Sequence, residues 1–423
     1  MDTEARKCYI YHLVKAVRTT SIMLLKTKPL SDFITSTTLD QGGQVLDSLF
    51  VFDKKPRMAL GNLDGTVDKP FVIHLNHAIL IPEKSATPLP DRVRKKQVIP
   101  PRPLRYKRGN LLLTSGKDLF SESLTRNAII PDCLSYIDGK FWTAKLPAIE
   151  HRINEDCLFI ELIGRSFGHS LLDMPARLWP LLEPMFEPLQ KLKPVSFGSH
   201  GIGMNYKIWP KFVHMLLDGL NLRPADIEII NQPTEISSLY VPRRITPLGT
   251  NHDAPPFYDL LQSMGAKLIA NYIAPTTPRS RIYLSRSRLD EASRGLEDNR
   301  ELEIEKIFLD LGFEIVHPQL LSLEEQIYNI RHADLIAGCA GSALHIAVFR
   351  AKPGLHLLRV APAFHNPPWD SKILAASQGE SIDFTISAES GARQINKAKW
   401  SISDAQLRDL AKFATAWVER VKP

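Results

Sequence analysis

Two short loops in this chain carry residue types that bind phosphate. Ser285–Arg288 brings two arginines directly after the apolar run Arg281–Leu284, and a guanidinium presents forked donors that match phosphate oxygens. Gly338–Ser342 reads Gly-Cys-Ala-Gly-Ser, and its small residues would let a ligand reach the backbone and the free amides that begin a helix. A solvated basic loop and a tight structural turn are the respective alternatives. Together the two loops predict a site for a phosphorylated ligand.

A third segment, Phe167–Asp173, could supply acid–base chemistry. His169 and Asp173 are four residues apart, so a helix would place them on one face. A carboxylate beside an imidazole orients it and raises its proton affinity, as a general base requires. The alternative is a histidine at a helix N-terminus that a local hydrogen bond satisfies. The other histidines lack the spacing of zinc ligands, so no metal site is predicted.

The chain contains no Asp-x-Asp sequence. Enzymes that hold a sugar-nucleotide diphosphate through a divalent cation usually need carboxylates so placed. Arginines and helix amides would therefore have to neutralise a leaving diphosphate here. This pattern favours a transferase that works without a metal or another cofactor.

The elements that must position these loops follow a regular order between Arg281 and Val360. Strands and helices alternate there, and the carboxyl ends of parallel strands lie on one edge of a sheet, so both loops should face one crevice. Asn299 is predicted to cap a helix that ends at Gly312. Capping boxes at Ser322–Glu325 and Ser403–Gln406 begin two more helices. The last helix could pack on its own domain or on a neighbouring one.

A chain of 423 residues predicts two or three domains of α/β class. Residues 1–145 read as a β-rich extension, because short apolar runs alternate with Gly-Asn, Asp-Gly and proline turns. Residues 146–274 and 275–423 each read as a Rossmann-like domain, because strands alternate with helices.

The composition, 44% hydrophobic and 23% charged, indicates a globular protein, and the net charge of +7 favours anionic partners. The basic stretch Arg92–Arg108 holds three prolines and one tyrosine, which favours an exposed loop over a nucleic-acid surface and leaves a weak contact with anionic lipid open. The four cysteines show no paired spacing. With no signal peptide and no apolar stretch of membrane-spanning length, a cytoplasmic location is expected.

Several motifs, in this order along the chain, resemble glycosyltransferase family 61. Phe167–Asp173 with Arg177–Trp179 is similar to the family's Asn-x-x-His-x-x-x-Asp helix. The later matches are Arg281–Arg286, Asn299, Gly312–Val316, Leu323–Ile327, Ala333–Asp334, Gly338–Leu344, Phe349 and Pro353–Gly354. The resemblance covers residues from about 155 to about 360.

This resemblance implies a GT-B arrangement, in which two Rossmann-like domains face each other across a cleft, and inverting chemistry without a metal. It implies a nucleotide-sugar donor, a glycan or lipid-linked glycan acceptor at the cytoplasmic face of a membrane, and no nucleic-acid partner. Bacterial members are linked to capsular polysaccharide or exopolysaccharide synthesis. His169 or Asp173 would be the base on the acceptor side of the cleft. The residues implied for donor binding are Arg286, Arg288, Arg294, Asn299, Gly338, Gly341 and Ser342.

Two positions depart from the family pattern. The histidine of the family's glycine turn falls on Ala340, and the glutamate of its Asn-Glu pair falls on Arg300, with Glu301 one place on. These departures leave room for a second hypothesis, a non-catalytic component of a polysaccharide assembly that binds a sugar nucleotide or glycan. RNA binding through the stretch Arg92–Arg108 is the third and least favoured hypothesis.

Overall fold

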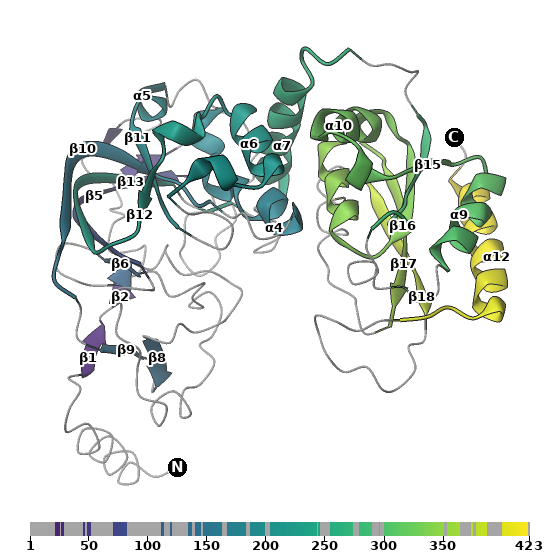
Figure 1. Cartoon of the computed structure of the whole chain (residues 1–423), viewed down its shortest axis with the longest axis horizontal. Helices are drawn as coiled ribbons and strands as arrows, with labels where there is room; N and C mark the ends of the chain where they lie inside the picture. The colour runs from purple at the N-terminus through teal and green to yellow at the C-terminus, as the bar shows by residue number, and fades with distance from the viewer. Residues whose placement is uncertain are drawn as a thin grey trace, which may run out of the picture. The chain divides into compact units, whose positions relative to one another are not determined.

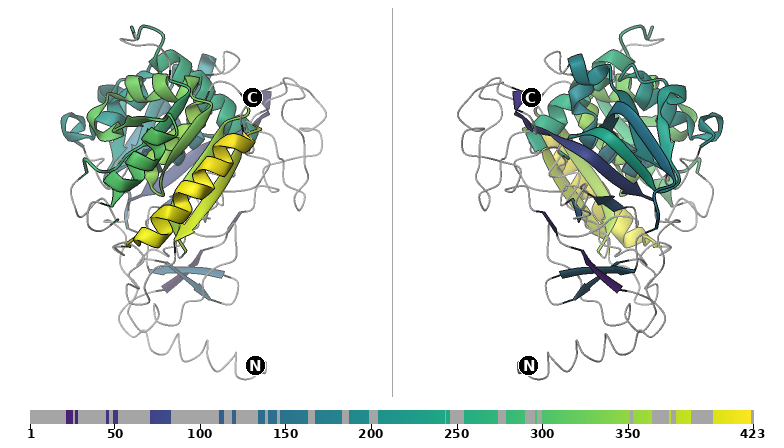
Figure 2. Two further views of the ribbon diagram at one scale, coloured as in Figure 1. Left: turned by 90° about the vertical axis from the view of Figure 1, so that its right-hand side faces the viewer. Right: turned by 90° about the vertical axis from the view of Figure 1, so that its left-hand side faces the viewer.

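The computed structural model of the chain is shown in Figures 1 and 2. It describes short strands within the first 70 residues and then residues 71–82, 111–113, 119–120, 134–137, 140–144, 147–162, 167–182, 187–198, 204–242, 244–245, 254–273, 279–289, 296, 300–350, 353–363, 374, 378–386 and 400–421. The predictions for Arg92–Arg108, Arg294 and Asn299 lie outside these described residues.

The chain forms two compact units of mixed α/β structure, each with parallel strands, as predicted for the fold class. Unit 1 holds Met1–Arg165, Ala176–Trp209 and Arg223–Ile245, and unit 2 holds Ser166–Pro175, Pro210–Leu222 and Thr246–Pro423. The predicted domain boundaries at residues 145 and 274 stay predictions.

Unit 1 contains a ten-stranded sheet. Its main path is β12 (Glu228–Ile230), β11 (Lys193–Phe197), β10 (His151–Phe159), β13 (Thr234–Pro242), β5 (Phe71–Ile81), β6 (Leu111–Leu113), β7 (Leu119–Phe120) and β2 (Thr27–Lys28), with β3 (Val45–Leu46) and β4 (Leu49–Val51) beside it. Strands β10 to β13 are mutually parallel, whereas β5 pairs with β13 in antiparallel register. The described part of the predicted β-rich extension is therefore built of strands, and β5 belongs to the same sheet as β10 to β13.

The other elements of unit 1 are short. A three-stranded antiparallel sheet joins β1 (Ile22–Leu25), β9 (Lys140–Ala144) and β8 (Leu134–Ile137). The helical segments that the structure describes there are η4 (Pro175–Arg177), whose first residue falls in unit 2, η5 (Trp179–Leu181), α5 (Glu187–Gln190), η7 (Tyr206–Ile208) and η8 (Pro224–Asp226). The apolar core lies on the strands, and Ile153, Val195 and Leu239 are among its buried members.

Unit 2 is built on a five-stranded parallel sheet. Its order is β15 (Glu314–Val316), β14 (Arg281–Leu284), β16 (Leu335–Cys339), β17 (His356–Pro362) and β18 (Glu380–Ile386). Numbered along the chain, these strands run 2-1-3-4-5, an order of doubly wound sheets. The direction of the order reverses between β14 and β16, and ligands bind such sheets beyond the carboxyl ends of the strands at that point.

Helices cover both faces of this sheet. Figure 1 shows α10 (Leu323–His332) on one face and α9 (Glu301–Asp310) with α12 (Asp404–Arg420) on the other. Figure 2 shows α12 running along β18, with which it makes contact, so the last helix packs on its own unit. Because both faces are covered, every residue of β16 is buried. The remaining helices that the structure describes in unit 2 are α4 (Phe167–Leu172), α6 (Lys211–Asp218), α7 (Ala254–Leu268), η9 (Pro318–Leu320) and η10 (Ser342–Phe349).

Three of the predicted helix ends are confirmed. Both capping boxes are present, at Ser322 and at Ser403. Gly312 adopts a φ of 78°, and the amide of Phe313 donates to the carbonyl of Phe308, which closes the C-terminus of α9. The described part of α9 begins after Arg300, whose side chain makes no capping hydrogen bond, and the Asn299 cap stays a prediction. Within the described residues, no helix has the length and apolar character needed to cross a bilayer.

Candidate functional site

The two phosphate-type loops meet in unit 2. The loop after β14 and the turn after β16 are neighbours across the point where the strand order reverses. There Arg286 Nη1 donates to the carbonyl oxygen of Ala340 over 2.9 Å. The sequence predicted that the two loops face the same crevice, and the hydrogen bond between Arg286 and Ala340 confirms that they lie side by side.

The two glycines of the turn do different work. A Cβ on Gly341 would lie 2.7 Å from Arg286 Nη1, so the absence of a side chain makes room for the guanidinium. A Cβ on Gly338 would lie 2.9 Å from the carbonyl oxygen of Leu284 and 3.0 Å from Leu344 Cδ2. Gly338 is therefore required for packing between β14 and the helix η10, whereas Gly341 shapes the surface on which Arg286 lies.

The start of η10 faces solvent. Ser342 is its first residue and is exposed, and the first amides of a helix have no acceptor within that helix. Arg288 is exposed as well, and it forms no ion pair with any residue that the structure describes. The turn therefore offers donors and positive charge on an accessible surface.

Internal hydrogen bonds hold the arginine loop in shape. Ser285 is fully buried, and its amide donates to the carbonyl of Val316 over 2.8 Å. The amide of Ser287 donates to Ser285 Oγ over 3.0 Å, and the amide of Leu289 donates to the carbonyl of Arg286 over 2.9 Å. The loop is a compact turn and not an extended strand end.

Glu301 is a buried acid beneath this loop, and no site role was predicted for it. Its side chain is 1% exposed, and Oε1 accepts hydrogen bonds from the amide of Arg286 over 2.8 Å and from the hydroxyl of Tyr283 over 3.3 Å. Burial raises the pKa of this carboxyl, against the lowering effect of the bond from the Arg286 amide. The sequence did hold one signal for this residue, because Glu301 lies one place after Arg300, the position of the glutamate in the family's Asn-Glu pair.

The helix α4, which carries His169, packs against η10. A Cβ on Gly168 would lie 2.8 Å from Ser342 Cβ and 3.0 Å from His345 Cδ2. The sequence placed this helix in the 146–274 domain, on the wall opposite the donor loops. The structure instead groups it with unit 2, because glycine and small residues let the two helices approach closely.

The two predicted catalytic residues lie in α4 and directly after it. Asp173 is 1% exposed, so it lies within the packed interior at the end of α4. His169 belongs to α4 one residue after Gly168, so its backbone lies beside the start of η10. Their catalytic roles stay predictions.

A second arginine cluster lies in unit 1, after the parallel strands β10 and β13. Arg177 Nε and Arg244 Nε lie 3.6 Å and 3.2 Å from Glu161 Oε2. Arg177 is 1% exposed, also donates to the carbonyl of Pro242, and lies over the ring of Phe159. The two guanidiniums share one carboxylate in an enclosed place, which suits a structural clamp between strand ends.

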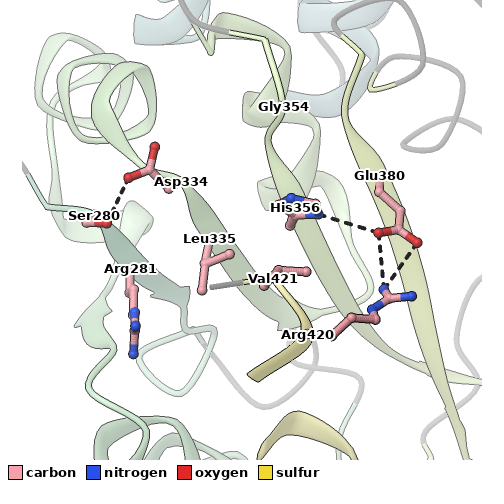
Figure 3. Close-up of a pocket in the computed structure, with 9 residues that line it drawn as sticks. All are labelled: Ser280, Arg281, Asp334, Leu335, Gly354, His356, Glu380, Arg420 and Val421. Atoms are coloured by element: carbon pink, nitrogen blue, oxygen red, sulfur yellow. Dashed lines mark hydrogen bonds and ion pairs between the residues drawn. The ribbon is translucent and has the colours of Figure 1, made fainter. Parts of the chain in front are cut away.

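The opposite, amino edge of the sheet in unit 2 holds a cavity of about 680 Å³ (Figure 3). Figure 3 shows Leu335 and Val421 in its middle, with charged side chains on either side. The lining residues are Ser280, Arg281, Asp334, Leu335, Gly354, His356, Glu380, Arg420 and Val421.

Two ion pairs balance charges at this amino-edge cavity, and Arg281 there donates to a backbone carbonyl. Arg350 Nη2 lies 2.8 Å from Asp334 Oδ1, and Arg420 Nη2 lies 3.1 Å from both carboxylate oxygens of Glu380. Arg281 Nη1 donates over 3.0 Å to the carbonyl of Leu311, the C-cap residue of α9. The cavity is therefore a less favourable anion site than the carboxyl edge.

Neither described cysteine is suited to nucleophilic chemistry. Burial raises the pKa of the Cys157 thiol to about 12 and that of Cys339 well above its usual value. In the described portion of the chain, no three His, Cys, Asp or Glu side chains gather as a metal ion would require. These observations leave the arginine loop and the glycine turn as the best-supported candidate site.

Comparison with known proteins adds a family match. Residues 167–358 match the model of the family described as Glycosyltransferase 61. No curated protein sequence matches the chain. Both loops, α4 and Glu301 lie within the matched segment.

Two crystal structures of an iron-containing dodecameric glycosyltransferase, TibC, resemble the chain weakly. The complex described as heptosyltransferase TibC with ADP-D-beta-D-heptose gives a TM-score of 0.30 at 10% identity, over 90% of this chain and 98% of that one. TibC from enterotoxigenic E. coli H10407 gives a TM-score of 0.27 at 9% identity, over the same shares. Similarity at this level supports no conclusion about the site.

Proposed function

We propose, from the premise that residues 167–358 of this chain belong to glycosyltransferase family 61, that the protein moves a sugar from a nucleoside-diphosphate sugar to a glycan or lipid-linked glycan. One observation carries the proposal. Arg286 lies on the glycine turn at the reversal point of the parallel sheet in unit 2. That point is where doubly wound sheets bind ligands, and guanidinium and helix amides are groups that bind diphosphates.

The donor diphosphate would lie between the arginine loop and the start of η10. The leaving nucleoside diphosphate gains negative charge as the glycosidic bond breaks, and preorganised donors at that place lower the barrier. Arg286, the exposed Arg288 and the amides at Ser342 supply such donors. Gly338 and Gly341 keep the turn close to β14 and to the guanidinium. Arg294 and Asn299 are proposed to complete the donor site.

The reaction would proceed by one displacement. The acceptor hydroxyl oxygen forms a bond to the anomeric carbon as the bond from that carbon to the diphosphate oxygen breaks. The hydroxyl proton passes to a base, and the configuration at the anomeric carbon is inverted. We assign the base to His169, because α4 packs beside Ser342. Asp173, which is buried, suits the orientation of that histidine better than direct contact with substrate.

The finer features of the proposal rest on the sequence. The chain lacks Asp-x-Asp, so we propose that arginines and helix amides, and no metal ion, neutralise the leaving group. We further propose a GT-B arrangement of the two units and a role in capsular polysaccharide or exopolysaccharide synthesis at the cytoplasmic face of a membrane.

A donor screen with the purified protein tests the proposal. Nucleoside-diphosphate sugars are offered with a panel of glycan and lipid-linked acceptors, and product is analysed by mass spectrometry and by NMR of the new anomeric proton. The expected product carries the configuration opposite to that of the donor and forms equally in EDTA. Retention of configuration would overturn the displacement, and loss of activity in EDTA would overturn metal independence.

Ala340 favours one alternative, a protein that binds a sugar nucleotide without turnover. The family's turn histidine falls on this position, and here it contributes a backbone carbonyl to Arg286 and a nearly buried methyl group. In that case the donor screen would give binding without product. Product formation by the unaltered chain would dismiss the alternative.

A further inference from the structure

Glu301 occupies an unusual environment for an acid in the first turn of a helix. Such residues commonly lie in solvent near the positive end of the helix dipole. Glu301 is instead 1% exposed, and its Oε2 is buried with no hydrogen-bond partner among the residues that the structure describes. A buried polar atom without a partner costs free energy, so another contact must account for an acid at this place.

The hydrogen bonds around Glu301 Oε1 join three elements of the candidate site. Glu301 Oε1 accepts one hydrogen bond from the amide of Arg286, in the loop, and another from the hydroxyl of Tyr283, in β14. The same hydroxyl lies 3.4 Å from the sulfur of Cys339, at the end of β16. Glu301 therefore links the helix α9 to both strands whose carboxyl ends form the site.

The backbone of Arg286 decides where its side chain points. The hydrogen bond that the Arg286 amide donates to Glu301 Oε1 fixes the peptide at Arg286. From there the guanidinium reaches the carbonyl of Ala340 and covers Gly341. Without that bond the loop amide would have to find another acceptor, and the arginine would lose its fixed starting point. A hydrogen-bond donor that is held in place to within a fraction of an ångström contributes more to the binding of a charged ligand than a mobile donor does.

We propose that Glu301 is a positioning residue that holds Arg286 over the glycine turn, so that the guanidinium is set in place before a diphosphate binds. The inference deepens the proposed function and rests on it. Glu301 does not touch the ligand, since it lies beneath the loop and not at its surface. A neighbouring acid, Glu305, accepts the hydroxyl of Ser285 and supports the base of the same loop.

The test compares three variants of the full-length protein. Glu301→Ala removes the acceptor, Glu301→Gln keeps an oxygen that can accept from the amide, and Glu301→Asp shortens the side chain by one methylene. Glu303→Gln is the matched control, because Glu303 lies on the same helix turn, is 52% exposed and pairs with Arg300 on the surface. If the alanine variant fails to fold, the aspartate variant answers the same question.

The first measurement is hydrogen exchange of the amides at 285–289, which needs no substrate. We expect faster exchange in Glu301→Ala or Glu301→Asp, and exchange close to that of the unaltered protein in Glu301→Gln and Glu303→Gln. Unchanged exchange in the alanine and aspartate variants would overturn the inference, whether or not the protein is a transferase.

The second measurement is the affinity for UDP, GDP and ADP by calorimetry, together with donor KM and kcat. We expect the Kd and the KM of Glu301→Ala to rise about tenfold, as for the loss of one hydrogen bond to a charged group, with kcat changed less. In Glu301→Gln both the Kd and the donor KM should stay close to those of the unaltered protein. Equal affinity in all four variants would refute positioning for the donor. If the unaltered protein bound no nucleoside diphosphate, the proposed function would fail, while the exchange result would still decide the contact.

Discussion

Arginines lie at both edges of the parallel sheet in unit 2, but their surroundings differ between the two edges. At the amino edge, Arg420 is matched to Glu380 and Arg350 to Asp334, so the charges cancel within the protein. At the carboxyl edge, Arg286 lies on the carbonyl of Ala340 and Arg288 is exposed without an ion pair in the described chain. Charge that is balanced by side chains supports the fold, whereas the exposed guanidinium of Arg288, on the loop beside the start of η10, is accessible to a ligand.

The cluster in unit 1 supports the same distinction. Arg244 follows the parallel strand β13, as Arg286 follows β14, but Arg244 and Arg177 of η4 enclose Glu161 and are almost inaccessible. An arginine after a strand is thus a poor indicator of an anion site by itself. Its partner and its exposure decide between a clamp and a binding group.

The largest contrast between the two edges is expected for histidines. His169→Ala should lower kcat about a hundredfold or more, the usual scale for a lost general base. His356→Ala, at the amino edge, removes an imidazole 3.4 Å from Glu380 and should leave kcat unchanged. Initial rates at saturating donor and acceptor check both. Equal rates for His169→Ala and the unaltered protein would remove α4 from the mechanism.

A glycine on each edge gives the next contrast. Gly341→Ala should raise the Kd for a nucleoside diphosphate about tenfold, because the new methyl group would displace Arg286, now 2.7 Å from the Cβ position. The backbone at Gly341 is extended, with φ 165°, so the variant should fold normally. Calorimetry and circular dichroism separate the two effects.

Gly354 is the control on the amino edge. Its φ is 85°, and a Cβ there would meet no atom within 4 Å. Gly354→Ala should therefore cost about 1 kcal/mol of stability through backbone strain and leave diphosphate affinity unchanged. A loss of affinity in Gly354→Ala, or none in Gly341→Ala, would contradict the assignment of the two edges.

A smaller effect concerns pH and the buried acid at the carboxyl edge. The folded pKa of Glu301 is raised above 4.5 by burial, so the folded state holds its proton more strongly than the unfolded state does. As pH rises from about 4.5 through the folded pKa, the unfolded state gains relative to the folded one, and this residue's contribution to stability falls.

Glu301→Gln carries no proton to release in that window. The midpoint of thermal unfolding of the unaltered protein, relative to Glu301→Gln, should therefore decrease as pH rises and level off above the folded pKa. Glu303→Gln, on the surface of the same helix turn, serves as control and should show no such trend. A difference that increases with pH would show that the carboxyl is stabilised as the anion.

Much of unit 2 could be predicted from local sequence. The capping boxes at Ser322 and Ser403 and the glycine at 312 are short-range signals, because each depends on hydrogen bonds within one turn of chain. The convergence of the two loops followed from the parallel order of strands. Those predictions needed no knowledge of distant contacts.

Long-range packing decided what sequence could not. Glu301 shares a helix face with the buried Ile304 and Phe308, but its contacts with β14 and β16 depend on residues far away in the chain. The grouping of α4 with η10 depends on the fit of Gly168 against Ser342, which lie far apart in the chain. Likewise, whether Gly338 or Gly341 faces Arg286 is set by the three-dimensional course of the turn.

Nucleoside-diphosphate binding to Arg286→Ala tests most directly the claim that the carboxyl edge is the donor site. Arg420→Ala is the matched control, because it removes a guanidinium that is paired and half exposed at the opposite edge. Calorimetry with UDP, GDP and ADP should show affinity reduced about tenfold or more in Arg286→Ala, as for a lost charged hydrogen bond, and unchanged in Arg420→Ala. Equal affinity in Arg286→Ala and the unaltered protein would contradict the account.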